Sequence, residues 1–219
     1  MISKNILIFL QNLAANNTKE WFDNNRIVYQ HSRTEFLDFI QCWIKELSLY
    51  DNEIATLEPK NCIFRINRDV RFSKDKAPYK TNFGAYLSKG GKKGNYGGYY
   101  LHIEPDNCFF GAGIYALEPS DLAKIRQEID YNFKDFWQIL NDKKFKVTFG
   151  SIDTENKLKK APKGYDDNNE AIEFIKLKNF IIGTKIDNNI ISTPELLQHL
   201  VTLSKQAIPF IRFLNQALD

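Results

Sequence analysis

Three short segments that combine aromatic and aliphatic residues follow one another between residues 82 and 117, and they constrain the fold more than any other feature. The segments NFGAYL, YYLHIEP and CFFGAGIYAL have the composition of strands, and a glycine- and lysine-rich loop and an EPDN turn separate them. Helical patterns lie on both sides, so strands and helices do not alternate strictly. This order predicts an α+β fold, a single domain over residues 1–219 with a mostly antiparallel sheet packed against several helices.

Apolar residues recur at helical spacing over much of the remaining chain. Helices are expected at residues 4–14, 18–49, 120–140, 169–178 and 193–218, the second of them as one helix or as two joined near Asn24 and Asn25. Further strands are expected at residues 61–67, 144–152 and 180–186. Asn17 and Glu20 have the spacing of a capping box, and Thr193 is the expected cap of the last helix.

The positive charge of the chain is concentrated in one segment. The net charge is only +3, from 30 basic and 27 acidic residues. Residues 65–93 alone carry a net charge of +7, which leaves −4 for the rest of the chain. A generally cationic protein would spread its charge over the surface, whereas this pattern favours a local anionic partner.

The stretch FRINRDVRFSKDKAPYK, residues 64–80, holds most of this positive charge. An arginine guanidinium offers a planar fork to a phosphate or carboxylate, and a lysine ammonium offers a point charge. The aspartates of the stretch would orient the guanidinium groups, and a tyrosine would supply a hydroxyl. The predicted ligand-binding residues are Arg65, Arg68, Arg71, Lys76, Tyr79 and Lys80. In the alternative interpretation, the arginines form ion pairs with Asp69 and Asp75 that hold a loop to the sheet.

The segment YYLHIEP places Tyr100, His102 and Glu104 on one face of a strand, because alternate residues share a face. Histidine titrates near neutral pH, so His102 is a candidate general base. Whether the protein catalyses a reaction stays open. The candidate catalytic residues are Asp69, Asp75, Tyr79, His102 and Glu104. In the alternative interpretation, His102 is a half-buried strand residue that makes ordinary hydrogen bonds.

Several other classes of site have no support in the sequence. The three cysteines form no CxxC pair, the three histidines lack metal-ligand spacing, and no GxSxG, HExxH or GxGxxG motif occurs. We therefore expect no metal and no cofactor, and reduced cysteines in a cytoplasmic protein. No apolar run approaches the length of a membrane span, so no membrane partner is expected. Two lysine-rich loops, at residues 88–98 and 159–165, are expected to be solvated, with Lys92 and Lys93 available to the periphery of an anion.

The stretch RINRDVRFSKDKAPYKTNFGAY resembles the signature of the DUF2461 family of uncharacterised bacterial proteins. The residues that carry the resemblance are Arg65, Arg68, Asp69, Arg71, Phe72, Asp75, Lys76 and Tyr79. The flanking segments NNTKEWFDNNR, GGYYLHIEP, FFGAGIY and LKKAPKGYD are also similar to the family. The resemblance implies one domain and a shared site, and it implies no particular substrate.

Three functions are compatible with these patterns. The first is binding of a small phosphorylated or otherwise anionic ligand, in an enzyme or in a binding protein. The second is nucleic-acid binding, with the basic loops and aromatic residues such as Tyr79, Tyr86 and Tyr96 in contact with the strand. The third is a structural protein in which the charged motif is an internal staple of ion pairs. The excess of arginines over local carboxylates favours the first function, and the oligomeric state stays open.

Overall fold

The strands form one antiparallel sheet in the order β1-β2-β3-β4. A computed structural model describes all residues from 1 to 219. Its strands are β1 (Phe83–Ser88), β2 (Gly98–Ile103), β3 (Phe109–Ile114) and β4 (Phe180–Lys185). All three strand pairs are antiparallel and several helices pack against the sheet, which confirms the predicted α+β fold.

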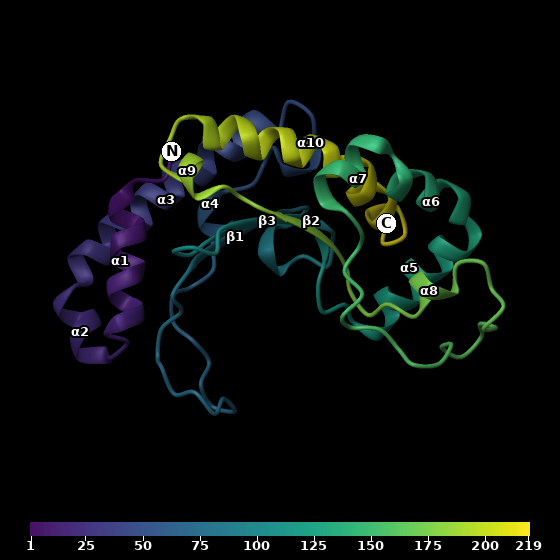
Figure 1. The fold of residues 1–219 in the computed structure, drawn as a ribbon, viewed down its shortest axis with the longest axis horizontal. Helices are drawn as coiled ribbons and strands as arrows, with labels where there is room; N and C mark the ends of the chain where they lie inside the picture. Colours follow the sequence, from purple (N-terminus) through teal and green to yellow (C-terminus); the bar gives the residue numbers. More distant parts are fainter.

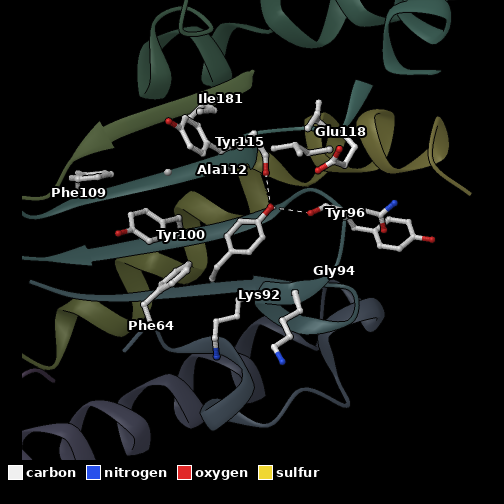
Figure 2. A pocket seen from close by; sticks show the side chains of 18 residues that line it. Phe64, Lys92, Gly94, Tyr96, Tyr100, Phe109, Ala112, Tyr115, Glu118 and Ile181 are labelled. Atoms are coloured by element: carbon white, nitrogen blue, oxygen red, sulfur yellow. Dashed lines mark hydrogen bonds between the residues drawn. The ribbon is translucent and has the colours of Figure 1, made fainter. Parts of the chain in front are cut away.

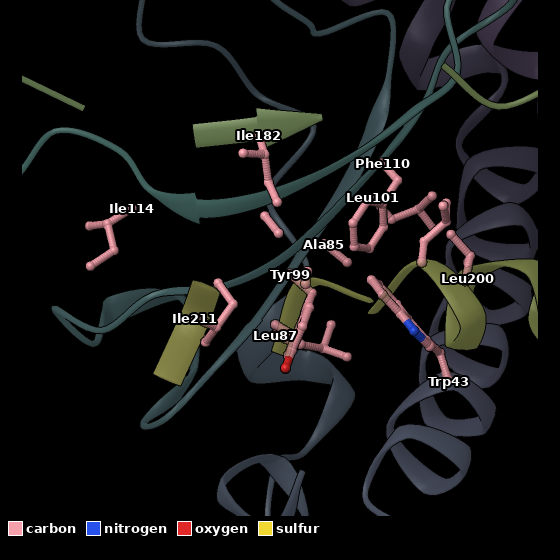
Figure 3. Packing of buried hydrophobic residues seen from close by; sticks show 14 of the residues in the cluster. Trp43, Ala85, Leu87, Tyr99, Leu101, Phe110, Ile114, Ile182, Leu200 and Ile211 are labelled. Carbon is pink, nitrogen blue, oxygen red and sulfur yellow. The ribbon is translucent and has the colours of Figure 1, made fainter. Parts of the chain in front are cut away.

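Two long helices, α3 (Arg26–Leu47) and α10 (Glu195–Gln216), cover one face of the sheet (Figure 1). The indole of Trp43, from α3, packs edge-on against the ring of Phe110 on β3. The same indole donates a hydrogen bond of 3.3 Å to the hydroxyl of Ser204 on α10. The main core therefore lies between these two helices and one face of the sheet (Figure 3).

The remaining helices leave the second face of the sheet uncovered (Figure 1). They are α1 (Lys4–Ala15), α2 (Lys19–Asn24), α4 (Pro59–Cys62), α5 (Pro119–Tyr131), α6 (Phe133–Asn141), α7 (Lys143–Phe149), α8 (Ile172–Ile175) and α9 (Asn188–Ile191), with short 3-10 turns η1 (Asn52–Ile54) and η2 (Gly91–Lys93). Figure 1 shows α1 and α2 on one side of the sheet and α5 to α8 on the other. None of the helices combines the length and the apolar character that crossing a membrane requires.

The predicted strand at residues 144–152 is wrong, because α7 occupies most of it. Phe145 and Phe149 lie four residues apart and are both buried, and the ring of Phe145 lies 6.0 Å from that of Phe210 on α10. The side chain of Asp142 caps this helix by accepting a hydrogen bond of 3.0 Å from the backbone N–H of Phe145. Two aromatic residues on one helix face, together with a cap, prevail over the alternating pattern.

The predicted strand at residues 61–67 is also wrong. Helix α4 ends at Cys62, after a proline at its first turn, and only isolated pairs follow, Ile63 with Ala85 and Asn67 with Tyr79. The chain nevertheless folds back on itself, so that residues 64–80 form an irregular hairpin, which we call the charged hairpin. Figure 1 shows it projecting away from the sheet on the uncovered side.

Two predicted helix caps are wrong as well. Of the two alternatives for residues 18–49, one helix or two joined near Asn24 and Asn25, the structure has the second, with α2 followed by α3. Thr18 caps α2, and the side chain of Asn17 donates to the backbone carbonyl of Tyr79 at 2.9 Å instead. The hydroxyl of Thr193 donates to a backbone carbonyl three residues earlier and leaves α10 without a side-chain cap. In both cases, a tertiary or turn contact takes the side chain that local spacing assigns to the helix.

Candidate functional site

The uncovered face of the sheet carries a pocket of about 670 Å³ (Figure 2). Its floor is the backbone of β3. Six aromatic side chains line the pocket. Three come from β1, β2 and β3, and three come from segments next to these strands: Phe64, Tyr86, Tyr96, Tyr100, Phe109 and Tyr115. A volume of this size is typical of pockets that hold small ligands.

Gly111, on the floor of the pocket, leaves space there although the fold could accommodate a side chain at this position. A Cβ atom at Gly111 would meet its nearest neighbours, the carbonyl oxygen of Ile182 and Cβ of Tyr100, at 3.7 Å, which is ordinary van der Waals contact. Gly113, two residues later, differs, because its φ is +127° and a Cβ atom there would lie 1.9 Å from the carbonyl oxygen of Phe180. The fold therefore requires glycine at position 113, whereas at position 111 the missing side chain only leaves space.

The hydroxyl of Tyr86 belongs to the framework of the pocket. It lies 2.9 Å from the carbonyl oxygen of Tyr96 and 2.8 Å from that of Gly113, and can donate to either (Figure 2). Burial raises the pKa of this phenol far above its ordinary value. Tyr86 thus holds the loop between β1 and β2 against β3, and its proton is not available for chemistry near neutral pH.

At one end of the pocket, three side chains form a hydrogen-bonded row. Tyr100 and His102 belong to β2, and Glu104 follows the strand. The hydroxyl of Tyr100 lies 2.9 Å from Nδ1 of His102, and Nε2 of His102 lies 3.1 Å from Oε2 of Glu104. The imidazole also stacks on the ring of Phe109, with 4.6 Å between ring centres. Gly84, on the neighbouring strand, leaves the room that the Tyr100 hydroxyl occupies, because a Cβ atom there would lie 2.8 Å from it.

The charge state of this row follows from its hydrogen bonds. Burial disfavours ionisation of Glu104, but donors from Thr81 at 2.6 Å and Asn107 at 2.9 Å, together with His102, prevail and lower the pKa of the carboxyl. An ionised Glu104 accepts a hydrogen bond from the N–H at Nε2, so in the neutral imidazole Nδ1 accepts a hydrogen bond from the Tyr100 hydroxyl. Burial, with a smaller contribution from Glu104, raises the pKa of Tyr100 to about 12. Tyr100 therefore stays protonated near neutral pH and acts by hydrogen bonding.

The base of the charged hairpin supplies one cation next to the pocket, Lys80, and a second cation, Arg65, that acts on the first. The ammonium of Lys80 lies 5.4 Å from the ring centre of Phe64, a ring that lines the pocket and meets Tyr100 edge-on. Burial and the neighbouring Arg65 lower the pKa of Lys80. Neither Arg65 nor Lys80 has a carboxylate within 4.0 Å. Neither cation therefore forms an ion pair, although Arg65 is one of the groups that lower the pKa of Asp69.

The tip of the charged hairpin is different, because its arginines are paired. Arg68 forms an ion pair with Asp75 and donates to the backbone carbonyl of Ala77 at 3.1 Å. Arg71 donates two hydrogen bonds to Asp69, of 2.9 and 2.7 Å. The bond to Arg71 lowers the pKa of Asp69, and the pKa of Asp75 is lowered first by the backbone N–H of Ala77 and then by Arg68. The local carboxylates thus neutralise two of the three arginines.

The other predicted residues of the hairpin also contact the protein itself. The ammonium of Lys76 donates to the carbonyl oxygen of Val70 at 3.0 Å. The ring of Tyr79 is buried and stacks on Phe22 of α2, with 4.0 Å between ring centres. The backbone of Tyr79 is bound on both sides by the amide of Asn17. Of the predicted residues, Lys80 lies beside a ring that lines the pocket, and Arg65 is close enough to Lys80 to lower its pKa. Ligand binding by the whole set remains a prediction.

Two further lysines border the pocket from the loop that contains η2. Lys92 and Lys93 both line it, and Lys92 donates to the backbone carbonyls of Lys60 and Asn61 at 3.4 and 3.3 Å (Figure 2). The second basic loop, with Lys159, Lys160 and Lys163, lies between α7 and α8, on the side of the uncovered face away from the charged hairpin (Figure 1). It contributes no residue to the pocket.

Sequence reasoning missed the floor and walls of the pocket. Gly111 and the aromatic residues Phe64, Phe109 and Tyr115 were not singled out, although glycine in the middle of a strand is a recognisable signal of close approach by another group. No cluster of three or more metal-ligating side chains occurs. The candidate site therefore consists of an apolar, aromatic pocket, a hydrogen-bonded row at one end and cations that form no ion pair at its rim.

Comparison with known proteins gives one match. A family model described as a conserved hypothetical protein (DUF2461) covers residues 5–213. No curated protein and no solved structure matches the chain. The match covers both the charged hairpin and every strand that forms the pocket.

Proposed function

We propose that this chain, which belongs to the DUF2461 family, binds a small anionic ligand in the pocket on the uncovered face of its sheet, with Arg65 and Lys80 as the residues that contact the anion. The observation that carries the proposal is the contrast within the charged hairpin. The arginines at its tip form ion pairs with aspartates, whereas Arg65 and Lys80 at its base form none, and Lys80 stands beside the ring of Phe64, which lines the pocket.

The environment of Lys80 supports this assignment. A partly buried ammonium is less stable than one in water, because the protein around it solvates the charge poorly. Arg65 adds repulsion from a like charge. An anion placed between the two groups would relieve both effects, so ligand binding and the charge of Lys80 would stabilise each other. Lys92 and Lys93 extend the positive rim along the same side of the pocket.

The row formed by Tyr100, His102 and Glu104 supplies the chemistry that an enzyme would need. When His102 is neutral, the Tyr100 hydroxyl donates to Nδ1; when His102 is protonated, Nδ1 donates instead, and the hydroxyl is free to donate toward the pocket. We therefore propose these residues, rather than Asp69, Asp75 or Tyr79, as the acid–base groups if the ligand is a substrate.

The experiment is a titration of the purified protein with phosphate, sulfate and small phosphate monoesters, followed by calorimetry and by the melting temperature. A ligand that binds only the folded state raises the melting temperature as its concentration exceeds its dissociation constant. We expect Lys80→Ala and Arg65→Ala to weaken binding. Arg71→Ala serves as a matched control, because it removes a cation of the same hairpin that is already paired. Equal affinities in all three variants and the parent would contradict the proposal.

A second function, binding of single-stranded nucleic acid, is favoured by one further observation. Phe72, at the tip of the charged hairpin, is 95% exposed among the neighbouring cations Arg71 and Lys74, an arrangement that suits stacking on a base beside a phosphate. It ranks second because Tyr79 is buried and the hydroxyl of Tyr86 is already bonded. This function predicts that a labelled oligonucleotide binds with an affinity that falls steeply with salt, and that Phe72→Ala weakens binding.

We also propose that the protein is cytoplasmic. All three cysteines are free, and Cys62 and Cys108 are buried. Free cysteines persist best in a reducing compartment, which supports our expectation of a cytoplasmic protein.

A further inference from the structure

The walls of the pocket indicate the kind of ligand as well as its charge. Aromatic residues make up six of the eighteen that line the pocket, against 14% of the whole chain. Their rings come from separate segments, and Figure 2 shows Phe64, Tyr100 and Phe109 grouped at one end and Tyr115 above the floor. Such a concentration of rings around a shallow space favours a ligand that also presents flat apolar faces.

The floor of the pocket has the matching shape. Phe109, Gly111 and Gly113 are alternate residues of β3 that all line the pocket, and the two glycines bring no side chain. What remains is the pleated backbone itself, bounded by Tyr100 on β2 and by Ile181 on β4. A flat floor with apolar walls accommodates a planar ring better than a branched aliphatic or a polyhydroxylated body, because the ring can contact peptide groups over its whole face.

The cations are placed at the edge of this surface rather than on it. Phe64 connects the pocket with Lys80, because its ring lines the pocket and the ammonium of Lys80 lies 5.4 Å from the centre of that ring. A ligand that places its ring in the pocket would therefore bring a substituent at the ring's edge toward Lys80, whose ammonium also feels the charge of Arg65.

We infer that the ligand is a planar aromatic compound that carries a phosphate or a similar anion, of which aryl phosphates and nucleotides are examples. The inference rests on the proposed function, because it uses the same pocket and the same cations. It adds the requirement for a ring, which neither the charge of the hairpin nor its pairing implies.

The test compares 1-naphthyl phosphate with glycerol 2-phosphate, which has the same anionic group without a ring, and with 1-naphthol, which has the ring without the anion. Affinities are measured by the fluorescence of the naphthyl group and by competition. We expect 1-naphthyl phosphate to bind at least tenfold more tightly than either of the other two compounds. Lys80→Ala should weaken binding of both phosphates by a similar factor.

Gly111→Val separates the ring from the anion. The new side chain would occupy the floor of the pocket, so we expect the tenfold advantage of the naphthyl group to disappear while glycerol 2-phosphate binds as it does to the parent. Gly111→Ala, whose Cβ makes only ordinary contacts, is the second variant in case the valine disturbs the fold, and it should reduce the advantage in part.

These measurements distinguish failure of the inference about the ring from failure of the proposed anion site. If 1-naphthyl phosphate binds no more tightly than glycerol 2-phosphate, or if its advantage survives in Gly111→Val, the inference about the ring is overturned and the anion site stands. If no compound binds, or if Lys80→Ala and Arg65→Ala leave every affinity unchanged, the proposed function fails and the inference fails with it.

Discussion

Substitution of Gly111 by alanine tests whether the glycine on the floor of the pocket lowers the stability of the fold. Glycine in the middle of a strand loses more backbone freedom on folding than alanine does, and this costs roughly 0.5–1 kcal/mol. Alanine at position 111 would recover that amount, since the nearest atoms to its Cβ lie at 3.7 Å and the backbone there has no positive φ. We therefore expect Gly111→Ala to be more stable than the parent, without ligand, by about 0.5–1 kcal/mol.

The assay is thermal and urea unfolding of both proteins at the same pH and salt. For a protein of this size, each kcal/mol moves the melting temperature by about 2–4 °C, so a rise of roughly 1–4 °C is expected. Gly113→Ala is the matched comparison, one position along the same face of β3. Its Cβ would lie 1.9 Å from a backbone oxygen of β4 at a φ of +127°, so we expect strong destabilisation or failure to fold.

If Gly111→Ala melts well below the parent, then position 111 needs glycine for the fold, and the open floor is no evidence for a ligand. If it melts higher and also binds 1-naphthyl phosphate less tightly, then stability and binding make opposite demands on one residue. That combination is typical of functional sites.

Three further outcomes are expected. Asp69→Asn or Arg71→Ala should leave the melting temperature nearly unchanged, because this ion pair is exposed to solvent, with 45% and 76% of the two side chains accessible; a large fall would restore the interpretation of the hairpin tip as a structural staple. Tyr99→Phe should destabilise the protein by about 1.5–3 kcal/mol in urea unfolding, since its hydroxyl donates to the buried carboxylate of Asp51 at 2.7 Å. Glu104 has a pKa below its ordinary 4.5 in the folded state, so its contribution to stability is present above that pH and is lost as the pH falls through the lower folded value; Glu104→Gln should flatten this part of the curve of melting temperature against pH.

Local pattern was enough to find most of the elements. The strands β1, β2 and β3 and the long α10 all follow from periodicity, turn residues and composition, which act over a few neighbouring residues. The failure at residues 144–152 marks the limit of such reasoning. A short run with two phenylalanines suits either a strand or a helix, and contact of Phe145 with Phe210 of α10, far away in sequence, selects the helix.

The features of the site also divide into those that local sequence predicts and those that depend on the pairing of strands. Alternation along β2 is a local property, so the sequence alone puts Tyr100, His102 and Glu104 on one face. Their partners are not local. Gly84, which makes room for the Tyr100 hydroxyl, and Thr81, which donates to Glu104, come from the neighbouring strand, and only the register of β1 against β2 aligns them.

What the sequence by itself determined is the fold class, the concentration of charge between residues 65 and 93 and the polar face of β2, because each depends on neighbours along the chain. Only the tertiary structure decided which cations are free. Asp69 and Asp75 are close to every arginine of the motif in sequence, yet the turn of the hairpin delivers them to Arg71 and Arg68 and leaves Arg65 without a partner. The pocket, too, exists only because the register of three successive strands places their aromatic and glycine positions side by side and pairs them with β4. Electrostatic and packing energies depend on such distances in space.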